Sequence, residues 1–163
     1  MSDANAKSMS MIVTKGTLDW AYPPFILANT AASMGLEVTL FFTFYGLTLL
    51  KKDLDLKITT LGNAAMEMPM MGMHIAMPNL VGAVPGMDSM ATSMMKSLIK
   101  KKGVASIEEL REMAVEQEVR MIACQMTMDL FEYEQKDMID GIEYAGAATY
   151  IERATQCDIN LFI

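Results

Sequence analysis

Histidine and cysteine are scarce in this chain of 163 residues: His74 is the one histidine, and Cys124 and Cys157 are the two cysteines. A serine–histidine–aspartate triad could use only His74 as its base. A zinc site of four cysteines, or of two cysteines and two histidines, cannot be built. The glycine-rich dinucleotide-binding motif, the P-loop and the H-E-x-x-H zinc motif are also absent from the sequence. We therefore expect neither a metal nor another cofactor.

Basic residues are few as well. The 13 lysines and arginines are outnumbered by 20 aspartates and glutamates, which gives a formal net charge of −7, and the one basic block covers residues 100–102. Proteins bind the phosphates of nucleic acids through lysine and arginine. We therefore expect no nucleic acid as a partner.

The sequence also lacks long apolar runs and an export signal. The longest uncharged apolar run covers residues 38–50, which is shorter than the ~20 residues of a membrane-spanning helix. Residues 1–7 lack the basic start and the apolar stretch of a signal peptide. With two thiols and no export signal, we expect a cytoplasmic protein without a membrane span.

Methionine, in contrast, is abundant, with 19 residues. Many of them fall in a stretch of about residues 61–89, which we interpret as a long insertion between two βα units. Thioether side chains are flexible and polarizable, and they suit a lid or a subunit contact. A different hypothesis uses residues 66–77, where methionines and His74 could bind Cu(I) in a non-catalytic copper-binding or interaction protein. A helix is predicted after the insertion at residues 90–102. Its side chains expected to face the core are Met94, Met95, Leu98 and Ile99.

Short segments rich in β-branched or aromatic residues alternate with helical ones along the chain. The predicted strands are 9–15, 36–44, 119–124 and 159–163. Two other helices are predicted at 20–34 and 126–133, and a third opens with a capping box at 106–109. The last predicted helix has one apolar side, formed by Tyr144, Ala147, Ala148, Ile151 and Ala154. Alternating strands and helices form a parallel sheet covered on both faces. We therefore predict a single α/β domain over residues 1–163.

Cys124 is the leading candidate for chemistry, because it ends one predicted strand just before a predicted helix. Ligands and reactive groups gather at this edge of a parallel sheet, and a helix N-terminus lowers the pKa of a thiol. The alternative is a buried strand cysteine that packs as a small hydrophobe. Cys157 precedes the last strand, at the opposite edge. A strand of about five residues spans roughly 16 Å, and bridged Cα atoms lie within about 7 Å, so we expect no disulfide and a structural role for Cys157.

Several residues share the predicted edge with Cys124 and are candidates to line its pocket. They are Lys15, Gly16, Tyr45, Gly46, Gln125 and Thr127. Lys15 could place a positive charge beside a thiolate, or it could be a solvated surface lysine. An acidic cluster between residues 129 and 143 could face a basic protein partner, or it could be a solvated surface.

Three segments of the sequence resemble a known family. They are Gly16-Thr17-Leu18-Asp19 with the following residues 28–38, then Phe41-Phe42-Thr43-Phe44-Tyr45-Gly46-Leu47, and Ile122-Ala123-Cys124-Gln125-Met126-Thr127-Met128. These segments are similar to those of the DsrE/DsrF/DsrH-like proteins. The resemblance extends from Met11 to Ile163 and includes the Met-rich insertion. The thiol-bearing segment is its most specific part.

The resemblance implies a three-layer α/β/α domain with a five-stranded parallel sheet, homo-oligomers and a role in cytoplasmic sulfur trafficking. In that family a single cysteine accepts a persulfide sulfur from a donor, such as a rhodanese-like protein, and passes it to a small carrier, such as a TusA-like protein. Carried over to this chain, that cysteine is Cys124. Whether the protein turns over as a sulfurtransferase or only carries sulfur stays open. A fifth strand is expected between Lys57 and Lys136, with residues 56–61 as the better candidate.

Overall fold

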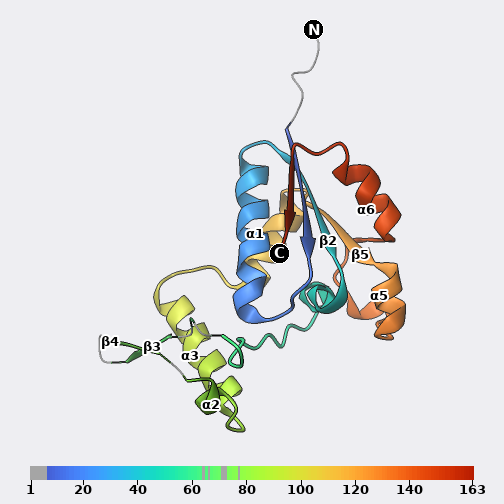
Figure 1. Ribbon diagram of the computed structural model, residues 1–163. Coiled ribbons are helices and arrows are strands. Elements are labelled where there is room, and N and C mark those ends of the chain that lie inside the picture. The colour runs from blue at the N-terminus through green and yellow to red at the C-terminus, as the bar shows by residue number, and fades with distance from the viewer. Residues whose placement is uncertain (1–6, 64, 66, 71–72, 77) are drawn as a thin grey trace. The chain divides into compact units, whose positions relative to one another are not determined.

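The computed structural model describes residues 7–63, 65, 67–70, 73–76 and 78–163 (Figure 1). The chain divides into two compact units. The first contains the chain up to Gly16 together with Trp20–Asp55 and Ile107–Ile163, and the second contains Thr17–Asp19 and Leu56–Ser106. Cys124 and Cys157 both belong to the first unit.

The first unit is built on a five-stranded sheet in which every neighbouring pair of strands is parallel. The strands are β1 (Ser8–Val13), β2 (Glu37–Phe42), β5 (Arg120–Cys124), β6 (Glu143–Ala145) and β7 (Ile159–Phe162), in the order β6-β5-β2-β1-β7. The register pairs Val13 with Phe42 and Phe42 with Ala123, so β1, β2 and β5 end at one edge. Nearly all residues of these three strands are buried, as in parallel sheets covered on both faces.

Helices cover both faces of this sheet. On one face lies α1 (Leu18–Ser33), where the ring centroid of Phe25 is 6.1 Å from that of Phe42. On the other lies α6 (Ala147–Ala154), where Tyr150 stacks on Phe41 at 4.9 Å. Successive residues of a strand point to opposite faces, so α1 and α6 lie on opposite sides of β2. The predicted three-layer α/β/α architecture with a five-stranded parallel sheet is confirmed.

The remaining helices of the first unit are shorter. They are α4 (Ile107–Glu116), α5 (Gln125–Leu130) and the 3-10 helices η1 (Phe44–Leu50) and η2 (Gln135–Asp137). The side chain of Asn29 donates a hydrogen bond of 2.8 Å to the carbonyl oxygen of Leu110, which ties α1 to α4 inside the protein. Both α5 and η1 directly follow the carboxyl end of a strand, and they contact each other there.

The predicted position of the fifth strand is wrong. That strand is β6, Glu143–Ala145, and Tyr144 belongs to it rather than to the following helix. Residues 56–61 form no strand, although Leu56, Ile58 and Thr60 are buried in strand-like alternation. Their backbone is held by other partners, because Ile58 N–H donates to Thr92 Oγ1 and Thr59 N–H donates to Asp19 Oδ1. β6 has only three residues at the edge of the sheet, too few for a periodic pattern.

The second unit contains the whole of the predicted insertion. It forms an antiparallel hairpin of β3 (Glu67–Met70) and β4 (Met73–Ala76), followed by α2 (Asn79–Gly82) and α3 (Met87–Lys101). Its core contains Ile58 and Ala91, against which Met87 and Met95 pack. Met94, predicted to face inward, is exposed, because α3 buries Ala91 and Thr92 instead.

The copper hypothesis on residues 66–77 falls partly on Met66, Met71 and Met77, which lie outside the described residues. It therefore stays a prediction. Across the part of the chain that the structure describes, no His, Cys, Asp and Glu side chains form a group of three or more that could hold a metal ion. No helix among the described residues is both long and apolar enough to cross a membrane.

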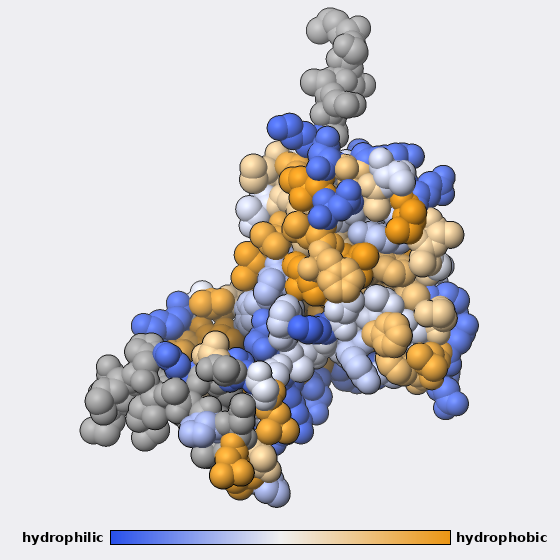
Figure 2. All heavy atoms as spheres, viewed as in Figure 1, coloured by the Kyte–Doolittle hydropathy of each residue, from blue (hydrophilic) through white to orange (hydrophobic). Residues whose placement is uncertain are grey.

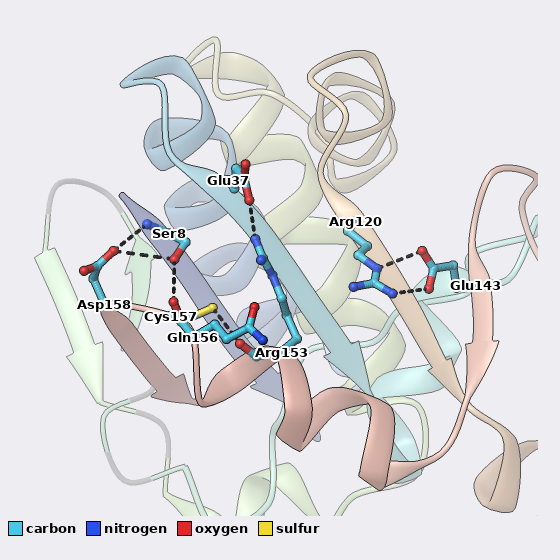
Figure 3. A network of polar contacts seen from close by, with 8 residues as sticks. All are labelled: Ser8, Glu37, Arg120, Glu143, Arg153, Gln156, Cys157 and Asp158. Carbon is cyan, nitrogen blue, oxygen red and sulfur yellow. Dashed lines mark hydrogen bonds and ion pairs between the residues drawn. The ribbon is translucent and has the colours of Figure 1, made fainter. Parts of the chain in front are cut away.

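Polar contacts hold the amino-terminal edge of the sheet together (Figure 3). Arg120 makes two hydrogen bonds to the carboxylate of Glu143, at 2.8 and 2.7 Å, which join β5 to the edge strand β6. Arg153 binds Glu37, which joins α6 to β2. These pairs are partly exposed, so each contributes roughly 0–1 kcal/mol to stability and mainly fixes the register of short elements.

Candidate functional site

Cys124 is the last residue of β5 and the N-cap of α5, at the carboxyl edge of the sheet. The residue is only 3% exposed, and it packs in a core cluster with Phe41, Ile122 and Tyr150. The thiol therefore lies at the edge where parallel sheets gather reactive groups, but inside the protein rather than on its surface.

Two threonine hydroxyls meet beside Cys124. Thr127, from the first turn of α5, is fully buried, and its Oγ1 lies 3.1 Å from Oγ1 of Thr43, which directly follows β2. The backbone N–H of Phe44 donates a hydrogen bond of 3.3 Å to the same Thr127 oxygen. Phe44 has a φ of 47°, in the left-handed region that a bulky residue rarely adopts. Strain of this kind concentrates at functional sites.

Opposing effects act on the pKa of the Cys124 thiol. Burial is the largest of them and raises the pKa, because a thiolate is poorly solvated inside a protein. Hydrogen bonds from the hydroxyl and backbone N–H of Thr127, the hydroxyl of Thr43 and the backbone N–H of Met126 lower it. Together they outweigh burial, so the pKa lies below its usual value. The thiolate, which is the nucleophilic form, is correspondingly more abundant at neutral pH.

The predicted pocket residues fall into different environments. Thr127 lies in the first turn of α5, which Cys124 caps, and it lowers the pKa of the thiol. Gln125 is exposed, and its side-chain amide donates to Asp129 Oδ1 at 2.9 Å. The Lys15 ammonium lies 3.2 Å from the ring centroid of Trp20. Its partner is thus an aromatic ring, and it does not contribute to the pKa shift of Cys124.

The two predicted glycines allow chain segments to approach closely at this edge. A Cβ atom on Gly46 would lie 2.2 Å from the carbonyl oxygen of Val13, and one on Gly16 would lie 2.2 Å from that of Tyr45. The N–H of Gly46 also donates to the carbonyl oxygen of Thr14 at 3.0 Å. These glycines therefore support the site by packing, because they allow the loop after β1 to lie against η1.

An aromatic cluster on η1 and the segment after α5 was not predicted. Its Phe44 and Tyr45 are exposed, and its Phe131 and Tyr133 are half-buried. Tyr45 stacks on Phe131 at 5.6 Å, and Phe44 and Tyr133 contact the same ring edge-on or tilted. Met126 and Leu130 are also exposed on α5. Figure 2 shows apolar side chains on this part of the surface. Phe131 and Tyr133 come after a short helix, so no periodic pattern pointed to them.

Thr43 was also missed as a site residue. The signal that could have found it is its position, because it directly follows a buried strand that neighbours β5. The register pairs Phe42 with Ala123, and the next residues of the two strands are Thr43 and Cys124. A hydroxyl side chain at that position can reach a neighbouring thiol.

Cys157 lies just before β7, at the amino edge, as predicted. It is half-buried, and its thiol donates to the carbonyl oxygen of Arg153 at 3.4 Å. Both cysteines are free thiols, and they lie at opposite edges of the sheet.

Comparison with known proteins agrees with this architecture. The sequence model of the DsrE/DsrF/DrsH-like family matches residues 5–162. The chain belongs to this family. It is 60% identical over 157 residues to the sulfur carrier protein DsrE2 of Allochromatium vinosum, a match that covers 96% of this chain and 98% of that protein.

Two further matches show similarity but do not indicate a function. The chain is 36% identical over 162 residues to YrkE of Bacillus subtilis, described as uncharacterized, with 96% of this chain and 97% of YrkE covered. The crystal structure of the ychN protein from E. coli superimposes with a TM-score of 0.53 and 12% identity, over 96% of this chain and 99% of that one. At this identity the structural match shows a shared DsrE-like fold.

Proposed function

We propose that this DsrE-like protein is a sulfur carrier that accepts and passes on a persulfide sulfur through Cys124. The observation that carries the proposal is the position of Cys124, the N-cap of α5 at the carboxyl edge of the sheet, next to the paired hydroxyls of Thr43 and Thr127. These neighbours lower the pKa of the thiol despite its burial. The likeness to a named sulfur carrier over nearly the full length of both chains supports it.

The chemistry needs one thiol and no cofactor. In the loading step, Cys124–S⁻ attacks the outer sulfur of a donor persulfide R–S–SH. A new S–S bond forms, the donor S–S bond breaks, and R–S⁻ leaves with the electron pair, which gives Cys124–S–SH. In the unloading step an acceptor thiolate attacks the outer sulfur in the same way, and Cys124–S⁻ is restored. Each step moves one neutral sulfur atom, so no external oxidant or reductant is consumed.

Burial of Cys124 shapes how this exchange takes place. A persulfide adds one S–S bond, about 2 Å, beyond the buried Sγ. Loading therefore requires local movement at the carboxyl edge, where α5 and η1 contact each other and β5. Both are short helices, and short elements with few hydrogen bonds open at low cost. When the edge closes, the persulfide is shielded from oxidants in solution.

The proposed partners follow from the same role. We expect a rhodanese-like donor, a TusA-like acceptor, and self-association of this chain in the cytoplasm. The partly exposed aromatic cluster around Phe131 supports a protein contact close to Cys124, because aromatic side chains are enriched where proteins bind one another.

Separate replacement of the two cysteines tests this function. Wild type, Cys124→Ser and Cys157→Ser are treated briefly with polysulfide, and their intact masses are measured before and after dithiothreitol. Wild type and Cys157→Ser should gain about 32 Da per sulfur, reversed by the reductant, and Cys124→Ser should gain none. Equal uptake by Cys124→Ser and wild type would overturn the proposal.

A further inference from the structure

The Thr43–Thr127 hydroxyl pair has a geometry that goes beyond simple packing. Thr127 is fully buried, its oxygen lies 3.1 Å from that of Thr43, and it accepts the N–H of Phe44. The groups that favour the Cys124 thiolate are these hydroxyls and backbone N–H groups, with no charged side chain among them. The register pairs Phe42 with Ala123, so Thr43 and Cys124 follow as neighbours and the hydroxyl pair lies next to the sulfur.

The hydrogens of the two hydroxyls decide which atoms this pair can bond. Each hydroxyl has one hydrogen to donate and lone pairs that accept. When Thr43 donates to Thr127, the hydrogen of Thr127 can point at Sγ if Sγ is negative. Thr43 can donate to Sγ or to Thr127. When Cys124 is a neutral thiol, the hydroxyls rotate and accept its S–H without movement of heavy atoms.

The three states of Cys124 use this pair differently. In the thiolate, the negative charge is on Sγ and the hydroxyls are well placed to stabilise it. In the persulfide, Sγ is a neutral divalent sulfur, which is a weak acceptor, and the acidic S–H is one bond further out. The hydroxyls therefore interact more strongly with the state that has lost its outer sulfur than with the loaded state.

We propose that Thr43 and Thr127 are positioning residues that stabilise Sγ as the leaving thiolate, and so promote transfer of the outer sulfur to an acceptor. This inference rests on the proposed function. As the acceptor attacks, the bond between Sγ and the outer sulfur breaks and its electron pair goes to Sγ. Pre-oriented donors aimed at an atom that gains charge accelerate such a step, and a more stable leaving thiolate leaves faster.

Cyanide is a suitable probe because it attacks the outer sulfur directly. The reaction is CN⁻ + Cys124–S–SH → SCN⁻ + Cys124–S⁻ + H⁺, and thiocyanate can be measured as it forms. The variants are Thr43→Val and Thr127→Val, which keep the shape and remove one hydroxyl each. Thr127→Ser keeps the hydroxyl, and Thr30→Val removes an exposed hydroxyl that bonds only within its own helix.

Each protein is loaded with polysulfide, freed of excess reagent and mixed with cyanide in a single turnover. Loss of a hydrogen bond to a charged group predicts about tenfold slower thiocyanate release from each valine variant. It also predicts an upward shift of the pKa seen in the pH profile of Cys124 alkylation. Thr127→Ser and Thr30→Val should behave as wild type. If Thr127→Val does not fold, the Thr43→Val variant provides the test, because Thr43 is only half-buried.

The outcomes separate this inference from the proposed function. If all proteins load sulfur on Cys124 and release it at equal rates, the hydroxyl pair has no role in transfer, although Cys124 is still the carrier. If wild type loads no sulfur on Cys124, the proposed function fails. Slow release from the valine variants, with normal release from Thr127→Ser, supports the inference.

Discussion

The two edges of the same parallel sheet hold one cysteine each, and they differ in how they are built. At the amino edge, partly exposed ion pairs join β5 to β6 and α6 to β2, and Cys157 is half-buried beside a backbone carbonyl that cannot donate to a thiolate. At the carboxyl edge, Cys124 is buried among uncharged donors. The accessibility and the reactivity of a thiol are therefore set separately, because neighbouring donors favour the anion even where water is excluded.

The largest expected effect is on packing at the carboxyl edge. Gly46→Ala would place a methyl group 2.2 Å from the carbonyl oxygen of Val13. Because backbone must move, we expect a loss of about 3 kcal/mol in the free energy of unfolding, measured by urea denaturation. Gly146→Ala is the matched control, because nothing lies within 4 Å of its added Cβ. Equal effects of the two changes would contradict the account of this edge.

The next effect is a pH dependence caused by Cys124. Its pKa is lower in the folded protein than the ordinary value of 9.0 for a cysteine thiol. A lowered folded-state pKa adds stability that is fully present above the unfolded pKa and is lost as the pH falls through the folded pKa. The stability difference between wild type and Cys124→Ser should therefore grow in favour of wild type as the pH rises from 7 to about 9.5. A pH-independent difference in urea titrations would show that the thiolate is not favoured by folding.

The smallest effect is expected at the amino edge. Glu143→Gln removes the charge that Arg120 binds, and we expect a loss of about 0.5 kcal/mol, because both side chains are partly exposed. Arg120 lowers the pKa of Glu143, so this contribution is present at neutral pH and disappears as the pH falls and Glu143 is protonated. Sulfur loading of Cys124 should not change. A strong loss of loading would mean that the two edges are coupled.

The sequence was sufficient to predict the parts of the fold that carry strong local signals. Buried strands such as β2 and β5 have continuous apolar runs, and they were found along with the position of Cys124 at the carboxyl edge. β6 was not found, because a three-residue edge strand is fixed by pairing with β5 and by the Arg120–Glu143 contact. The backbone partners of Ile58 and Thr59 are distant in sequence, so their strand-like alternation misled the prediction.

For the site, the sequence indicated which cysteine to examine and one of its neighbours, Thr127, but it did not indicate Thr43. Whether Lys15 or a hydroxyl lies beside the thiol depends on side-chain directions that pattern alone does not contain. In the structure Lys15 binds the ring of Trp20, and Thr43 approaches Thr127 from a neighbouring strand. Contacts of this kind join residues far apart in the chain.

The most direct test of the central claim compares the two thiols within one molecule. Wild-type protein receives less than one equivalent of polysulfide sulfur, is alkylated in the native state, and is mapped by peptide mass spectrometry. Our account predicts that the added sulfur is found on Cys124, although Cys157 is the more exposed of the two. Sulfur found on Cys157, with Cys124 unmodified and slow to alkylate, would contradict it and make Cys124 a core cysteine.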